Sequence, residues 1–141
     1  MPTIFAAGNV KSISNTEGIK KDDKFFHYSQ LIIPLKDNLV DVVLLYDVIH
    51  LVGYIGNGKT IRRSKRRNRE KLYSEVCRVA KPNALISVYA PHLRTHTDIE
   101  SEEDVKKELG DCGFRFIKEI YLRLIHDGNF VEDMILNFRK I

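Results

Sequence analysis

A buried strand that ends in polar side chains is the feature that most constrains how this chain can fold. Residues 41–45, Asp-Val-Val-Leu-Leu, form an apolar run rich in β-branched residues behind a turn signal. Such a run is typical of a strand buried on both faces of a parallel sheet. Tyr46, Asp47 and His50 then interrupt it where the strand should end. Because ligands of open α/β sheets bind at the carboxyl ends of strands, these residues are the first candidates for a functional site.

The rest of the pattern predicts strands that alternate with helices, followed by a hairpin. Apolar residues at helical spacing predict a helix over residues 66–80, and a second buried strand over residues 85–90. Ser101 begins an approximate capping box that starts another helix. Asp127-Gly128 indicates a hairpin within residues 114–141. Alternating strands and helices imply parallel pairing, whereas the hairpin must pair antiparallel.

Three further segments carry weaker patterns. Residues 3–7 and 10–14 flank Gly8-Asn9 and are typical of two short strands around a turn or of one bent strand. Glycines predict an exposed loop over residues 54–60. The third segment, residues 91–99, is expected to form another loop after the second buried strand.

Length and composition predict one soluble domain over residues 1–141. The chain is 43% apolar and 30% charged, which is ordinary for a globular protein. Its start has no targeting pattern, and its longest apolar run is broken by charged residues, so we expect no membrane span. Cys77 and Cys112 fall at apolar positions of predicted helices and are interpreted as reduced core thiols. This usage predicts a cytoplasmic protein.

Positive charge is concentrated in residues 59–71, the basic segment. It holds eight Lys or Arg residues and one Glu, whereas the whole chain has a net charge of only +4. Such a segment could contact several phosphates of a nucleic acid. The candidate polyanion-binding residues are Arg62, Arg63, Arg66 and Arg67.

Four segments carry a family pattern in the same order. They are Ile33-Pro34-Leu35-Lys36-Asp37-Asn38, Val40-Asp41-Val42-Val43-Leu44-Leu45, Val48-Ile49-His50 and Glu75-Val76-Cys77-Arg78-Val79-Ala80-Lys81-Pro82-Asn83. Together they resemble the second half of a class I S-adenosylmethionine-dependent methyltransferase of the small-molecule, type 11 kind. The resemblance implies a reduced Rossmann-like α/β fold, with a mostly parallel sheet, helices on its faces and a C-terminal antiparallel β-hairpin. It also implies methyl transfer from S-adenosylmethionine to a small-molecule nucleophile.

The glycine-rich loop that would hold this cofactor is not part of the pattern. Gly8 and Gly18 lie ten residues apart, with no Gly-x-Gly between them. We therefore expect a truncated domain in which the first strand and its helix are absent or replaced.

The resemblance also implies roles for individual residues. Ser29 stands where the family usually has an Asp that receives the adenine amino group, and Gln30 is next to the ring; an ordinary strand-end serine is the alternative. Tyr46 and Asp47 line the methionine end of the site. Tyr46 and His50 are the candidate catalytic residues, although His50 could instead be a half-buried helix histidine.

His92 and His96 are expected in a loop that faces the substrate. Their spacing, with Asp98 two residues later, could suit a metal ion if the segment were helical. The neighbouring Pro91 and Thr95 indicate a loop instead, so we expect no metal site.

Two other functions stay open. One is a non-catalytic module that binds nucleic acid or an acidic protein through the basic segment. The other is one half of a split methyltransferase, whose glycine loop is supplied by another chain or by a longer natural product; a homo-oligomer or a partner chain is therefore possible.

Overall fold

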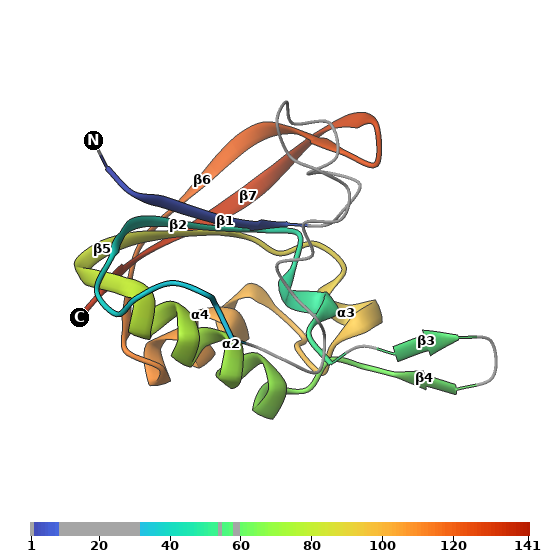
Figure 1. Cartoon of the computed structure of the whole chain (residues 1–141). Coiled ribbons are helices and arrows are strands. Elements are labelled where there is room, and N and C mark those ends of the chain that lie inside the picture. Colours follow the sequence, from blue (N-terminus) through green and yellow to red (C-terminus); the bar gives the residue numbers. More distant parts are fainter. Residues whose placement is uncertain (1, 9–31, 54, 58–59) are drawn as a thin grey trace.

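The computed structural model of this chain describes residues 2–8, 32–53, 55–57 and 60–141. A five-stranded sheet is at its centre, with the strand order β1-β2-β5-β7-β6 (Figure 1). The first three strands in this order are parallel, and the last two add antiparallel pairs. The strands are β1 (Ile4–Gly8), β2 (Val40–Tyr46), β5 (Ala80–Tyr89), β7 (Asn129–Lys140) and β6 (Phe114–His126).

The two longer described helices, α2 (Arg66–Val79) and α4 (Glu102–Asp111), lie on the same face of this sheet (Figure 1). A 3-10 turn, η1 (Ile49–Leu51), follows β2, and a one-turn helix, α3 (Leu93–His96), follows β5. β3 (Ile55–Asn57) and β4 (Thr60–Arg62) pair antiparallel in a separate two-stranded sheet. Among the described residues, no helix has the length and apolar character that a membrane crossing requires.

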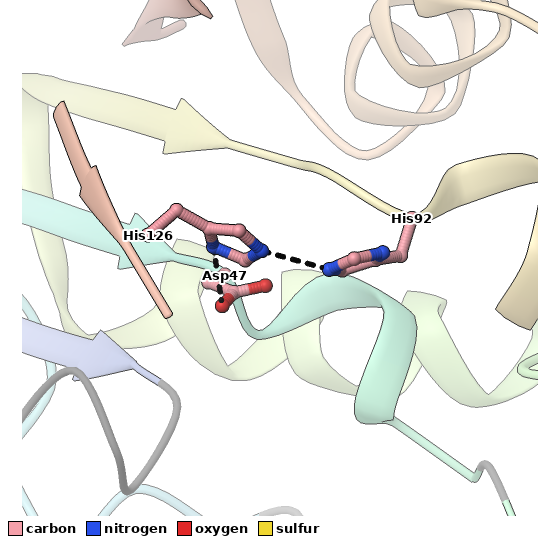
Figure 2. A group of neighbouring side chains, drawn as sticks. All are labelled: Asp47, His92 and His126. Carbon is pink, nitrogen blue, oxygen red and sulfur yellow. Dashed lines mark hydrogen bonds and ion pairs between the residues drawn. The ribbon is translucent and has the colours of Figure 1, made fainter. Parts of the chain in front are cut away.

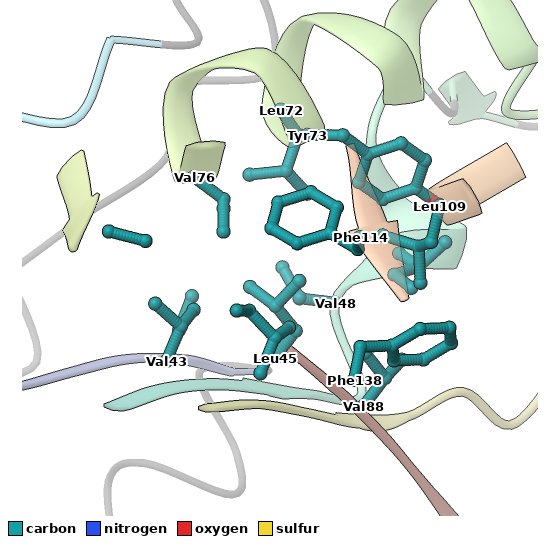
Figure 3. Close-up of a cluster of buried hydrophobic side chains, with 14 of the residues drawn as sticks. Val43, Leu45, Val48, Leu72, Tyr73, Val76, Val88, Leu109, Phe114 and Phe138 are labelled. Atoms are coloured by element: carbon teal, nitrogen blue, oxygen red, sulfur yellow. The ribbon is translucent and has the colours of Figure 1, made fainter. Parts of the chain in front are cut away.

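The hydrophobic core lies between the sheet and these two helices (Figure 3). Alternation along β2 decides which side chains reach it: Val43 and Leu45 are fully buried, whereas Leu44 between them is 38% exposed. The helices and the hairpin contribute Leu72, Tyr73, Val76, Leu109, Phe114 and Phe138.

A buried arginine connects the two core helices. Arg69 of α2 is 1% exposed, and its guanidinium donates to both carboxylate oxygens of Glu108 in α4, at 2.8 and 3.0 Å. It also donates to Asp98 at 2.6 Å and to the carbonyl oxygen of Ser64 at 2.5 Å. Because bidentate, charge-assisted hydrogen bonds are strong and directional, this network fixes α2 against α4.

Most of the predicted elements are confirmed. β2 covers residues 41–45, and α2 matches the helix predicted over residues 66–80 to within one residue. The capping box at Ser101 is present. Asp127 and Gly128 both have positive φ, 50° and 79°, as a tight hairpin turn requires. The parallel strands followed by an antiparallel hairpin confirm the predicted reduced methyltransferase-type fold.

The strand predicted over residues 3–7 is confirmed as β1, which pairs parallel with β2. Two expectations were wrong. Residues 54–60 were expected to form a loop, but β3 (Ile55–Asn57) and β4 (Thr60–Arg62) pair with each other as a hairpin. Leu93–His96 closes one helical turn through the bond from the His96 N–H to the His92 carbonyl oxygen. Of the helices expected on the faces of the sheet, the two longer described ones share one face.

Candidate functional site

The three parallel strands end in register at one edge of the sheet. Gly8 is paired with Tyr46, and Tyr46 with Tyr89. β6 runs in the same direction as β5, because each is antiparallel to β7, so its last residue, His126, reaches the same edge. We call this the carboxyl edge. In open α/β sheets, ligands bind beyond this edge.

Asp47 is the first residue beyond β2, and its side chain is fully buried. Its backbone is left-handed, with φ of 56°, and its N–H donates to the carbonyl oxygen of Tyr89 at 2.8 Å. The carboxylate lies 3.4 Å from Nδ1 of His50 and 3.4 Å from Nδ1 of His126. A non-glycine residue in this conformation is uncommon and is often found at functional sites.

Four of the five histidines in the chain form a cluster beside this carboxylate, and three of them, His50, His92 and His126, lie close to it; the fifth histidine of the chain, His27, lies outside the described residues. Ring centroids of neighbouring members are 4.9 to 5.4 Å apart. The members of this histidine cluster are His50 in η1, His92 before α3, His96 at the end of α3 and His126 at the end of β6. Three separate segments, η1, the α3 turn and the end of β6, therefore place imidazoles at the carboxyl edge.

His126 lies between Asp47 and His92 (Figure 2). Nδ1 of His126 faces the carboxylate, and its Nε2 is 2.9 Å from Nε2 of His92. Two imidazole nitrogens at this distance can share one proton, with one ring donating and the other accepting. Asp127 adds a second carboxylate, 3.4 Å from Nε2 of His126.

Two rings of the cluster, His50 and His96, favour the neutral form. Burial, together with repulsion from His92, His96 and His126, lowers the pKa of His50 to about 4. The pKa of His96 is also lowered, first by burial and then by His92. These rings are therefore uncharged at neutral pH and can accept a proton or a metal ion.

Tyr46 connects the carboxyl edge to the hairpin. Its hydroxyl donates to the carbonyl oxygen of Ile125, at 2.5 Å, and its ring lies 4.9 Å from that of Tyr89. Burial and the Asp47 carboxylate raise the pKa of Tyr46, so the phenol keeps its proton. The end of β6 is thus held against the end of β2.

The structure brings together five of the predicted site residues. These are Tyr46, Asp47, His50, His92 and His96. Ser29 and Gln30, the predicted adenine contacts, lie outside the described residues. The sequence analysis missed His126, although the Asp127-Gly128 turn signal, combined with the pairing direction, could have placed this residue at the carboxyl edge.

Within the basic segment, internal ion pairs engage part of the charge. Arg66 donates to Glu70 at 2.7 Å and to Asp111 at 2.6 Å, and Arg69 is buried as described above. Arg63 and Arg67 are exposed; the side chain of Arg62 is outside the described part. The basic segment therefore has fewer charges available to bind a polyanion than its composition predicts.

No protein-family model matches this sequence, and no curated protein matches it significantly. Solved structures do resemble it. A SAM-dependent methyltransferase from Methanosarcina mazei has a TM-score of 0.53 at 16% identity, covering 82% of this chain and 65% of its own. A SAM-dependent methyltransferase from Aquifex aeolicus has a TM-score of 0.51 at 20% identity, and the match covers 79% of this chain and 51% of that protein. The [4+2]-cyclase SpnF has a TM-score of 0.52 at 13% identity, and the match covers 78% of this chain and 53% of the cyclase.

These similarities show that the protein has the fold of class I SAM-dependent methyltransferases. The chain spans about half to two thirds of the length of the structures it matches. At identities of 20% or less, the similarity extends to the fold alone.

Proposed function

We propose that this chain binds S-adenosylmethionine at the carboxyl edge and transfers its methyl group to a small-molecule nucleophile. The observation that carries this proposal is the register of Gly8, Tyr46 and Tyr89, which aligns the ends of three parallel strands where ligands of such sheets bind. The fold of the similar structures supports the same choice of cofactor.

The side chains at this edge fit a cationic cofactor. The sulfonium of S-adenosylmethionine carries a positive charge and supplies the activated methyl group. The rings of Tyr46 and Tyr89 and the buried carboxylate of Asp47 both attract cations. Gly8 ends β1 without a side chain, which allows close approach to the backbone.

The contribution of the protein to the chemistry is mainly positioning. Methyl transfer requires the nucleophile, the methyl carbon and the sulfur in line, so shape matters more than a strong acid or base. The imidazole of His96, whose pKa is lowered by burial, can accept the proton that a nucleophile loses. His50 is buried and has a low pKa, so it acts as a positioning residue rather than as the main base.

Two substitutions of Tyr46 separate its ring from its hydroxyl. Tyr46→Phe removes the hydrogen bond that holds Ile125 but keeps the aromatic face, so we expect cofactor binding as tight as in the wild type, or tighter. Tyr46→Ala removes the face as well, and we expect a dissociation constant roughly 10-fold higher, equivalent to ~1.4 kcal/mol. Isothermal titration calorimetry with S-adenosylmethionine measures both.

The wild-type titration is the primary test of this proposal. Heat that saturates at one ligand per chain supports it. A wild-type protein that binds neither S-adenosylmethionine nor S-adenosylhomocysteine at millimolar concentration contradicts it, and so does an equal loss of affinity in the Tyr46→Phe and Tyr46→Ala variants.

A further inference from the structure

Three side chains at the carboxyl edge are close enough to share one metal ion. Asp47, His92 and His126 each offer one ligand atom, and these atoms all lie within 4.8 Å of one another (Figure 2). They come from three places in the chain: the residue after β2, the residue before α3 and the end of β6. Such convergence from distant segments is what a chelating site requires.

We propose that Asp47, His92 and His126 form a binding site for a divalent transition-metal ion of the Zn²⁺ type. Two imidazoles and a carboxylate are ligands that Zn²⁺, Co²⁺ and Ni²⁺ accept. Mg²⁺ and Ca²⁺ prefer oxygen ligands alone and fit this set poorly. Three protein ligands leave further coordination positions open to water or to another small ligand.

The contact between His92 and His126 favours an ion. Their Nε2 atoms, 2.9 Å apart, face each other. A proton can bridge two such nitrogens, and a metal ion can take its place once both are deprotonated. Ligand atoms on a tetrahedral zinc lie about 3.3 Å apart, given bonds of about 2.0–2.1 Å. Small side-chain rotations therefore bring the three groups to an ion, and His92 is exposed and has room to rotate.

The surroundings suit a cation. Asp47 is fully buried, and a carboxylate at low dielectric gains more from a nearby positive charge than one in water. Nδ1 of His50 lies 3.4 Å from Oδ1 of Asp47. His50 is therefore placed as an outer partner that orients a metal-binding carboxylate. Asp127, 3.4 Å from His126, adds negative charge at the rim. His92 opens the site to solvent, which gives an ion a path of entry.

A bound ion would join the hairpin to the sheet and would leave His96, which is outside the proposed ligand set, for the proton transfer proposed above. Asp47 also belongs to the proposed cofactor site, but metal binding is tested separately from methyl transfer, because a Zn²⁺ titration needs no cofactor. No metal site was predicted from the sequence, because only the neighbouring His96 and Asp98 were weighed as ligands together with His92. Asp47 and His126 are far from His92 in sequence.

The test is a titration of the full-length chain without an affinity tag, after treatment with a chelator. Calorimetry with ZnCl₂ is expected to show one equivalent bound with micromolar or lower dissociation constant. Co²⁺ should give visible absorption bands of the intensity that tetrahedral coordination produces. MgCl₂ should give no heat.

His92→Ala and His126→Ala are the decisive variants. Both residues lie at the rim of the fold, so we expect circular dichroism of the metal-free variants to match the wild type while Zn²⁺ affinity falls at least 10-fold. Arg94→Ala, an exposed substitution in the neighbouring α3, is the matched control and should bind Zn²⁺ as the wild type does. Wild-type affinity in folded His92→Ala protein, or several weak equivalents unaffected by either histidine substitution, would overturn the proposal.

Discussion

Replacing Arg69 with alanine is expected to lower the free energy of unfolding by about 3–5 kcal/mol, which is the usual loss when one partner of a buried ion pair is removed. The substitution leaves the carboxylate of Glu108, whose side chain is only 5% exposed, without the guanidinium that now donates two hydrogen bonds to it. It also removes the donors to Asp98 and to the carbonyl oxygen of Ser64. Urea denaturation followed by circular dichroism measures the loss.

Arg66→Ala is the matched control in the same helix. Arg66 pairs with Glu70 and Asp111 at comparable distances, but the side chains of all three are more than 40% exposed. Exposed ion pairs contribute little, so we expect a loss of about 1 kcal/mol or less. The double variant Arg69→Ala/Glu108→Ala should lose less than the sum of its single variants, because no buried charge is left alone. Equal losses for Arg66→Ala and Arg69→Ala would refute this account of the network.

Replacing Leu45 with alanine is expected to lower the free energy of unfolding by about 2–5 kcal/mol. Its side chain is fully buried in the core between the sheet and α2, where the substitution leaves a cavity (Figure 3). Chemical denaturation at constant pH measures this loss from the shift of the transition midpoint.

Leu44→Ala makes the same chemical change one residue earlier. Leu44 points to the other face of β2 and is 38% exposed, so its removal should have an effect within about 0.5–1 kcal/mol. The difference between these two variants tests which face of β2 meets the helices. A larger loss for Leu44→Ala would mean that the other face is the core.

The sequence predicts the framework well because local patterns determine it. The apolar run of residues 41–45, the helical stripe of residues 66–80 and the Asp127-Gly128 turn each carry their own signal, and each is confirmed. β1 coincides with the strand predicted over residues 3–7. Its pairing with β2 comes from the tertiary structure, which the pattern of residues 3–7 alone does not specify.

The site was predicted only in part for a related reason. Tyr46, Asp47 and His50 follow a strand that the sequence identifies, so their position at the carboxyl edge could be predicted. The Asp127-Gly128 turn could place His126 at this edge, but its contacts with Asp47 and His92 depend on how the hairpin packs against the sheet, which the sequence does not specify. Arg69 was counted among the surface charges, because its acidic partners Asp98 and Glu108 lie 29 and 39 residues away.

The most direct test of the account is an NMR titration of ¹⁵N-labelled protein with S-adenosylhomocysteine, which reports where the ligand binds as well as whether it binds. The account predicts that the largest amide shifts fall at the carboxyl edge, at Gly8, Tyr46, Asp47 and Tyr89. The opposite end of β2 provides a contrast, since a surface pocket of about 430 Å³ there is lined by residues that include Asp37, Arg78 and Lys140. Shifts confined to that pocket, or a spectrum unchanged at millimolar ligand, would contradict the proposed function.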